Sequence, residues 1–526
     1  MSTAHVLPLS SPTLTRAEFA RRSDELAAEA EKRARERQHP RGRMTARERL
    51  DHLLDEGSLR ETDRFAGAAT PADFLGSGVI TGFGRIGGRE VAVYAQDFSV
   101  RGGSLGDIEG EKIARLMRQA IDRRLPLFAL LDSGGARIQD GVTSLARYGQ
   151  IFALATEASG VIPQISVVLG PCAGGAVYGP ALTDIVIMER EASYMFVTGP
   201  KVVQAATGEK ISSADLGGAD MHGSVSGVAH MVIDGERESL DAARAVLSYL
   251  PSHCGEAAPR YAFDGDDIGE AHARRVGDLV PEGAKQAYDM RDVIEALVDY
   301  GEFVEIHEHF AASVVVGFAC IDGRAVGIVA NQPNVDAGTL DVAASEKAAR
   351  FVTLCDTFGL PVVTLVDVPG YRPGSEQERA GIIRRGAKLI TAYASASVPL
   401  VTVIVRKAYG GAYIVMGSKS LGADVALAWP GAEIAVMGAE GAVDILHGKS
   451  LAAAERRGVD VAAQRAHYIE QWRASEISPD RALQTGELDG LVDPGETRWA
   501  IIDALRVTAA KPRPARSPRV RPNPPL

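Results

Sequence analysis

The sequence contains the same pattern twice, about 235 residues apart. The stretch "GFGRIGGREVAVYA" at 82–95 aligns with "GFACIDGRAVGIVA" at 317–330, and "LPLFALLDSGG" at 125–135 aligns with "LPVVTLVDVPG" at 360–370. Between these stretches, "EKIAR" in the first copy falls on "EKAAR" in the second. Because the matches are collinear and equally spaced, the repeat predicts two homologous domains in one chain.

Each copy alternates between strand-like and helix-like segments. In the first copy, residues 79–95 form two β-rich runs around a glycine turn, and residues 109–122 show the apolar spacing of a helix. The short apolar runs at 127–132 and 165–169 are typical of buried strands. This alternation predicts α/β domains, each with a largely parallel sheet.

The repeat also sets the expected domain boundaries. We place the first domain at 61–295 and the second at 296–510, preceded by a charged helical arm at 1–60. The last residues, 511–526, are basic and rich in proline, so we expect a disordered tail.

The arm carries its own helix signals. Thr45, with Glu48 three residues later, is typical of a capping box at a helix start. Leu50, Leu53 and Leu54 then form a narrow apolar stripe, which we interpret as suited to docking on another surface rather than to a core.

Composition excludes several partners. The net charge of −11 argues against nucleic acid, and no apolar run approaches the roughly 20 residues of a membrane span. The four cysteines are widely spaced and include no CxxC pair, which predicts a reducing, cytoplasmic location and no structural zinc. The start of the chain is no secretory signal, although its composition leaves a short targeting segment open.

Two glycine pairs follow apolar strands at matched positions. Gly174 and Gly175 lie in "GPCAGGAVYG" at 170–179, and Gly410 and Gly411 lie in "RKAYGGAYIVMG" at 406–417. Such a strand-to-helix turn exposes backbone N–H groups that a ligand can approach closely, which is how an oxyanion hole is built. Close packing of helix on strand also requires glycine, but two matched copies favour the functional interpretation.

Three other motifs have simpler explanations. "GFGRIG" at 82–87 fits the dinucleotide pattern, but a strand-like segment follows it, so we interpret it as a hairpin turn. "GGSLG" at 102–106 fits a nucleophile elbow, yet no strand leads into it, and we expect Ser104 to contact a ligand rather than attack it. Cys172, beside the first pair, is expected to pack in the turn. Asp132 and Asp367 are expected to cap turns at strand ends.

The motifs together resemble a known family. "RMTARERLDHLLDEGS", "GPCAGGAVYGPALTD", "SEKAARF", "VDVPGY", "RKAYGGAY" and "AWPGAEIAVMGAEGAV" resemble the carboxyltransferase β subunit of biotin-dependent acyl-CoA carboxylases, the propionyl-CoA carboxylase type. The resemblance implies two crotonase-like (ClpP/crotonase) domains and a hexamer whose sites lie between the first domain of one subunit and the second domain of its neighbour.

The resemblance also implies roles for the glycine pairs. Gly174 and Gly175 would hold the acyl-CoA thioester oxygen, and Gly411 and Ala412 the biotin ureido oxygen. The biotin anion itself would take the α-proton, so no side-chain base or metal is expected. Further substrate contacts are expected at residues beside the pairs: Ser104, Ala173, Ala176, Tyr178, Gly410 and Ile414.

The remaining expectations concern partners and substrate. The chain lacks a biotinylation motif and an ATP-binding motif, so the resemblance implies a separate α subunit that carries biotin and biotin carboxylase activity. Members that prefer propionyl-CoA commonly carry Asp where this chain has Ile414, which predicts a broader enzyme that carboxylates acetyl-, propionyl- and butyryl-CoA to malonyl-, methylmalonyl- and ethylmalonyl-CoA. A methylcrotonyl-CoA carboxylase β subunit, the carboxyltransferase subunit of an acyl-CoA decarboxylase and a non-catalytic scaffold remain alternatives.

Overall fold

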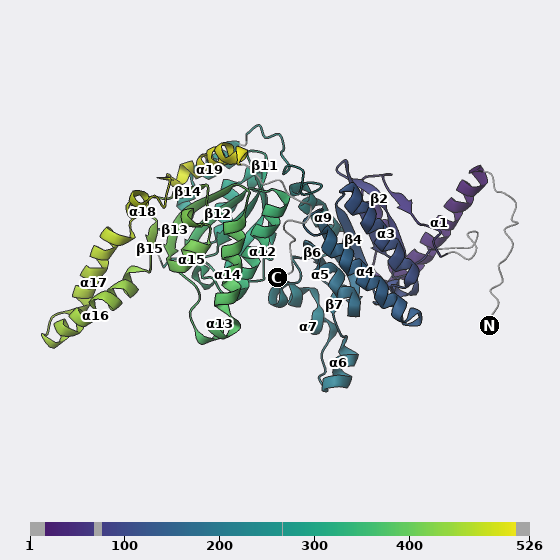
Figure 1. Ribbon diagram of the computed structural model, residues 1–526, viewed down its shortest axis with the longest axis horizontal. Coiled ribbons are helices and arrows are strands. Elements are labelled where there is room, and N and C mark those ends of the chain that lie inside the picture. The colour runs from purple at the N-terminus through teal and green to yellow at the C-terminus, as the bar shows by residue number, and fades with distance from the viewer. Residues whose placement is uncertain (1–15, 68–75, 266, 284, 512–526) are drawn as a thin grey trace.

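Two β-sheets with helices packed on their faces form the two halves of the molecule (Figure 1). The computed structural model describes residues 16–67, 76–265, 267–283 and 285–511. Most of the expected tail therefore lies outside the described residues, as does the start of the arm.

The first sheet has eight strands in the order β1-β2-β3-β4-β5-β6-β8, and β7 pairs with the end of β5. Its strands are β1 (Arg60–Thr62), β2 (Val79–Ile86), β3 (Arg89–Gln96), β4 (Leu127–Ser133), β5 (Gln164–Ala173), β6 (Ile185–Glu189), β7 (Tyr194–Phe196) and β8 (Met231–Ile233). The pairs β1–β2 and β2–β3 are antiparallel, and the others are parallel. The predicted hairpin and the largely parallel sheet are both confirmed.

The second sheet repeats this topology in the order β16-β14-β13-β12-β11-β10-β9, with β15 paired to the end of β13. Its strands are β9 (Phe303–Ile306), β10 (Val314–Ile321), β11 (Arg324–Asn331), β12 (Val362–Val368), β13 (Leu400–Tyr409), β14 (Val425–Ala428), β15 (Glu433–Ala435) and β16 (Gly490–Leu491). Equivalent strands have equal lengths from the hairpin to the glycine pair, so the sequence repeat is a structural repeat.

Helices cover the faces of both sheets. In the first half they are α1 (Arg16–Gln38), α2 (Ala46–Leu53), α3 (Asp107–Arg123), α4 (Val142–Ala158), α5 (Tyr178–Ala181), α6 (Pro200–Thr207), α7 (Ser213–Gly217), α8 (Ala219–Met221) and α9 (Glu236–Tyr249). In the second half they are α12 (Val342–Phe358), α13 (Ser375–Ala380), α14 (Ile382–Ser395), α15 (Gly410–Val415), α16 (Ala439–Arg456), α17 (Val461–Trp472), α18 (Pro479–Thr485) and α19 (Thr497–Val507). The connecting helices α10 (Asp267–Arg274) and α11 (Met290–Leu297) pack on the second half, whose core includes Met290, Val293 and Ile294 of α11. Helices α16 and α17 form a hairpin that projects from the second half (Figure 1).

The N-terminal arm packs on the first half through α2. The side chain of Thr45 accepts a hydrogen bond from the Glu48 N–H, and the Glu48 carboxylate accepts one from the Thr45 N–H, so the predicted capping box is confirmed. The interpretation of Leu50, Leu53 and Leu54 as a docking stripe was wrong. All three are buried in the hydrophobic core, because α2 closes one side of the sheet together with α9.

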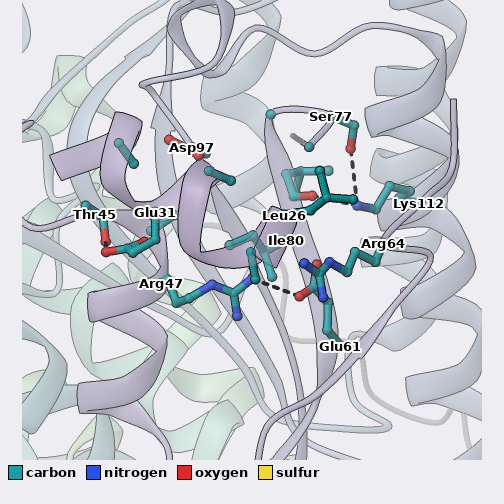
Figure 2. A pocket seen from close by; sticks show the side chains of 17 residues that line it. Leu26, Glu31, Thr45, Arg47, Glu61, Arg64, Ser77, Ile80, Asp97 and Lys112 are labelled. Atoms are coloured by element: carbon teal, nitrogen blue, oxygen red, sulfur yellow. Dashed lines mark hydrogen bonds and ion pairs between the residues drawn. The ribbon is translucent and has the colours of Figure 1, made fainter. Parts of the chain in front are cut away.

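A small cavity of about 50 Å³ lies where α1 and α2 meet the first strands (Figure 2). On one side of it, Arg47 forms an ion pair with Glu61 at 2.8 Å. On the other side, the buried Lys112 ammonium donates to the Ser77 hydroxyl and to the Val79 carbonyl. The arm is therefore fixed to the sheet by polar contacts as well as by leucine burial.

The two halves share buried contacts. Tyr249 on α9 stacks on Phe318 of β10, with ring centroids 5.9 Å apart. The Arg350 guanidinium on α12 donates to the carbonyls of Thr183 and Asp184 at 2.9 and 3.0 Å. Burial of each large apolar side chain contributes roughly 1.5–3 kcal/mol, so these contacts hold the halves together.

Candidate functional site: two strand-to-helix turns

The first glycine pair forms a sharp strand-to-helix turn at the end of β5. The strand ends at Ala173, a single 3₁₀ turn runs over Gly174–Val177, and α5 follows. Gly174 has φ of +65°, a conformation that disfavours any side chain. The first N–H groups of a helix have no carbonyl acceptor one turn back, so those of this turn are available to a ligand.

The second glycine pair repeats this geometry at the end of β13. The strand ends at Tyr409 and α15 begins at Gly410, whose φ of +60° matches that of Gly174. Gly411 and Ala412 therefore occupy the places that Gly175 and Ala176 hold in the first turn. The predicted donors are therefore offset by one position between the turns, because Gly174 and Gly175 correspond to Gly410 and Gly411, whereas the second predicted pair is Gly411 and Ala412.

Packing does not explain the glycine at the second position of each turn. A methyl group added to Gly411 would meet no other atom within 4 Å, and one added to Gly175 would meet only the Tyr148 ring at 3.8 Å. Neither residue has a left-handed φ. Glycine at these two positions therefore leaves space beside the backbone, as close approach by a ligand requires.

The second turn opens onto a cavity of about 440 Å³. Ile414, which is 47 % exposed, lines this cavity together with Ile434 and Val436, so the Ile414 side chain faces open space rather than packing behind α15. Arg481 and Glu487 add charged side chains to the lining of this cavity. These two residues were not predicted, because they lie about 70 residues from the glycine motif in a stretch with no recognisable pattern.

The remaining predicted contacts surround the first turn. Tyr178 on α5 is half-exposed and packs edge-on against Phe152, with ring centroids 6.0 Å apart. Ser104 lies in the loop after β3, where its hydroxyl donates to the Arg101 carbonyl at 2.9 Å. The same loop joins the end of β4, because the Gly134 N–H donates to the Gly102 carbonyl. Ser104 therefore lies near the sheet edge that carries the turn, with no strand-to-helix elbow beneath it.

The structure also resolves the other motifs. "GFGRIG" lies in the β2–β3 hairpin, as predicted. Cys172 is fully buried in β5, and burial raises the pKa of its thiol to about 12, so it is unsuited to act as a nucleophile.

The assignment of Asp132 and Asp367 as turn caps was wrong. Both carboxylates are fully buried and lie in ion-pair networks. Asp132 accepts from Arg43 at 2.7 Å and Arg49 at 2.9 Å, and Asp367 accepts from Arg406 at 2.9 Å. Burial raises the pKa of Asp132, and the two guanidinium groups oppose that shift. The cationic partners explain how a buried carboxylate is tolerated.

Apolar side chains are exposed beside both turns. Val197 directly follows β7 and is 57 % exposed, and Val436 directly follows β15 and is 84 % exposed. Further exposed apolar side chains lie on helices and loops elsewhere in the two halves: Ile138, Val142, Leu145, Val202, Ile383, Ile445 and Leu446. Such a density of exposed apolar groups is typical of surfaces that other molecules cover.

Within residues 16–511 as described, no group of three or more His, Cys, Asp or Glu side chains is arranged to hold a metal ion. The same part of the chain contains no helix that is both long enough and apolar enough to cross a bilayer.

Comparison with known proteins identifies relatives along nearly the whole chain. The model of the carboxyl transferase domain matches residues 37–523. The propionyl-CoA carboxylase beta chain of Saccharopolyspora erythraea is 51 % identical over 509 residues, which is 94 % of this chain and 93 % of the relative. Two other relatives are each 47 % identical: the methylmalonyl-CoA decarboxylase subunit alpha of Veillonella parvula (95 % of this chain, 96 % of the relative) and the biotin-dependent acetyl-/propionyl-coenzyme A carboxylase beta5 subunit of Mycobacterium tuberculosis (97 % and 95 %).

A solved structure shares the fold. The crystal structure of transcarboxylase 12S, a hexamer assembly with methylmalonyl-coenzyme A and methylmalonic acid bound, superposes with a TM-score of 0.89 at 42 % identity. The match covers 98 % of this chain and 100 % of the other. It confirms the predicted fold class, two homologous crotonase-like α/β domains in tandem.

Proposed function

Because the chain belongs to the carboxyl transferase domain family, we propose that it is the carboxyltransferase subunit of a biotin-dependent acyl-CoA carboxylase. Its reaction moves CO2 from carboxybiotin to the α-carbon of a short-chain acyl-CoA. The observation that carries this proposal is the pair of matched strand-to-helix turns, because the reaction develops negative charge on two oxygen atoms.

The first turn is assigned to the acyl-CoA. When the α-proton passes to the ureido anion that biotin becomes after it releases CO2, the thioester oxygen gains enolate charge, and the N–H groups of Gly174 and Gly175 would donate to it. Such donors stabilise a transition state by roughly 2.7–4 kcal/mol each in a site from which water is excluded. Ala173, Ala176, Tyr178 and Ser104 surround this turn and would contact the same substrate.

The second turn is assigned to biotin, which reaches this chain as a substrate carried by another subunit. Biotin supplies the carboxyl group, and its ureido oxygen gains charge when that group leaves. The N–H groups of Gly411 and Ala412 would donate to this oxygen. The apolar walls of the adjacent cavity, with Ile434 and Val436, fit a compact ring system. Gly410 sets the backbone direction through its left-handed φ.

Ile414 is assigned to substrate choice. It lines the cavity beside the second turn with an apolar side chain. An apolar wall discriminates by only about 1–3 kcal/mol per methylene. We therefore propose an enzyme that accepts acetyl-, propionyl- and butyryl-CoA. Decarboxylation of methylmalonyl-CoA is the second candidate reaction, because one relative is a methylmalonyl-CoA decarboxylase subunit. The same two turns would serve that reaction.

The proposed partners are a biotinylated α subunit and further copies of this chain. The exposed apolar side chains beside both turns support association of copies, and the related transcarboxylase is a hexamer. We propose a hexamer in which the first turn of one subunit faces the second turn of its neighbour. All four cysteines are free thiols, which supports a cytoplasmic location.

The proposal is tested by reconstitution. The purified chain should not incorporate 14C-bicarbonate into acyl-CoA when it is given ATP alone, and a biotinylated α subunit should restore incorporation across the acyl-CoA series. ATP-dependent incorporation by the chain alone would contradict the proposal that a separate α subunit carries biotin and the biotin carboxylase activity. Failure of every biotinylated α subunit to support incorporation would favour the decarboxylase reaction, which release of CO2 from methylmalonyl-CoA would then reveal.

A further inference from the structure

Asp132 and Asp367 mark the same irregularity in the two sheets. In the first sheet, Leu131 pairs with Val168, but Ser133 pairs with Cys172, so residues 169–171 lie opposite the single residue Asp132. In the second sheet, residues 405–407 lie opposite Asp367 in the same way. Each bulge directs the end of its strand into the glycine turn that follows. The buried carboxylate at each bulge therefore lies beneath a proposed oxyanion hole.

In the second half, the Asp367 carboxylate on β12 is stabilised mainly by two residues of the bulged neighbouring strand β13. The Arg406 side chain on β13 donates to Asp367 Oδ2 at 2.9 Å. The N–H of the next residue, Lys407, donates to Oδ1 at 3.2 Å, and the Lys407 ammonium lies 3.4 Å from that oxygen. The Tyr288 hydroxyl donates to Oδ2 at 3.0 Å. Both carboxylate oxygens are thus paired.

In the first half, the equivalent strand β5 has no basic side chains at the positions of Arg406 and Lys407. Gly170 and Pro171 stand where the second half has Arg406 and Lys407. Glycine supplies no side chain and proline has no N–H to donate. Accordingly, Asp132 Oδ1 is buried without a hydrogen-bond partner among the described residues.

The N-terminal arm supplies the missing charge. Arg43 donates to Asp132 Oδ2 at 2.7 Å and also to the carbonyl of Leu169, inside the bulge. The Arg43–Asp132 pair occupies the space that a side chain at Gly170 would fill, because a Cβ there would lie 2.2 Å from Asp132 Oδ1 and 2.5 Å from Arg43 Nη2. Both arginines also contact Glu236 on α9, Arg49 through two hydrogen bonds at 2.6 and 3.0 Å and Arg43 through one long contact at 3.4 Å. Arg49 reaches Asp132 as well, but it makes no hydrogen bond to the backbone of β5. Arg49 therefore anchors the arm, whereas Arg43 contacts the bulge directly.

We propose that Arg43 is a positioning residue for the first oxyanion turn: through Asp132 and the bulge of β5, the N-terminal arm supplies the positive charge that Arg406 and Lys407 of the bulged strand β13 supply in the second half. This inference deepens the proposed function and rests on it for its catalytic consequence. Gly174 lies three residues beyond Pro171, so displacement of the bulge displaces the N–H groups of Gly174 and Gly175. Arg43 thereby acts on the acyl-CoA side of the reaction and not on the biotin side.

The first test measures hydrogen exchange and needs no activity. In the full-length chain, Arg43→Ala should raise amide exchange over residues 167–173 by roughly tenfold or more, because local opening becomes easier. Exchange over residues 403–409 should stay unchanged. The matched control is Arg47→Ala, which breaks the arm contact to Glu61 without touching Asp132 or β5 (Figure 2). Unchanged exchange in Arg43→Ala, or equally fast exchange in Arg47→Ala, would overturn the inference.

The second test is a double-mutant cycle on carboxyl transfer from methylmalonyl-CoA to free biotin. Arg43→Ala and Asp132→Asn should each lower kcat by about 10–100-fold, somewhat less than the loss of a whole donor, with the KM for biotin unchanged. If Arg43 acts through Asp132, the double variant should be no slower than the worse single variant. Multiplied losses would overturn the inference.

Two further measurements keep the outcomes separable. Arg43→Lys retains the charge but not the forked geometry, so it should recover part of kcat; if Arg43→Ala does not fold, the exchange comparison is made with Arg43→Lys. If the wild-type chain transfers no carboxyl group, the proposed function fails, while the exchange experiment still decides the role of Arg43.

Discussion

Replacement of Gly411 by valine tests the second oxyanion turn with little risk to folding. Gly411 has no left-handed φ, and a Cβ on it would meet no atom within 4 Å. The unfolding free energy of the Gly411→Val variant should therefore differ from that of the wild type by no more than about 0.5 kcal/mol, as for an ordinary surface substitution. Gly410→Val is the wrong choice, because its φ of +60° and the Val436 carbonyl 2.9 Å from a Cβ make it strained.

The expected loss of activity is large. The valine side chain fills the space where the ureido oxygen would approach the Gly411 and Ala412 N–H groups. Loss of one such donor costs about 10²–10³ in kcat, or roughly 2.7–4 kcal/mol. Because the side chain also blocks approach to the second donor, we expect kcat to fall by at least this factor.

The assay is carboxyl transfer with saturating acyl-CoA and biotin carried on the α subunit, with thermal unfolding and sedimentation measured in parallel. Gly431→Val is the matched control: Gly431 lies in an exposed loop between β14 and β15, has no left-handed φ, and has no neighbour within 4 Å of an added Cβ. The control should keep wild-type kcat. A Gly411→Val variant with normal stability, normal assembly and kcat within threefold of wild type would refute the assignment of this turn.

Gly175→Val should abolish transfer, because the valine side chain blocks approach of the thioester oxygen to the first turn. The variant should remain folded and assembled, because an added Cβ meets only the Tyr148 ring at 3.8 Å. Normal turnover would show that the first turn takes no part in the reaction. The wild type should use acetyl-, propionyl- and butyryl-CoA with kcat/KM values within roughly 200-fold of one another. Ile414→Asp should change their order of preference and restrict the enzyme to fewer of the three thioesters. An unchanged order of preference would show that Ile414 does not shape the acyl site. Cys172→Ser should retain transfer within about tenfold, because burial raises the pKa of the thiol to about 12 and leaves no thiolate nucleophile at neutral pH; complete loss in a folded variant would reopen covalent catalysis.

Local patterns predicted the fold and the paired turns. Strand-like runs, helical periodicity and glycine turns are encoded by neighbouring residues, so the β2–β3 hairpin and α3 follow from the sequence. The repeat strengthened the prediction of the turns, because each glycine pair could be compared with the pair at the matching position in the other domain. The matched φ values of Gly174 and Gly410 show that this comparison was sound.

Contacts between distant residues were not predictable in this way. Asp132 looked like a turn cap because its partners Arg43 and Arg49 lie more than 80 residues away in the arm. The leucines of α2 looked like a docking stripe because the helix α9 that buries them is nearly 200 residues further along the chain. Arg481 and Glu487 reach the cavity only through the packing of α18. In each case the role of the residue depends on a partner that is distant in the sequence, and no pattern among neighbouring residues indicates that partner.

The most direct test of the central claim is transfer of labelled carboxyl from 14C-methylmalonyl-CoA to free biotin by the purified chain, without ATP or an α subunit. The account predicts that the wild type forms labelled carboxybiotin, whereas Gly175→Val and Gly411→Val, each altering one turn, do not. Transfer that survives both substitutions, or its absence from an intact wild-type assembly with every short-chain carboxyacyl-CoA, would contradict a two-turn carboxyltransferase.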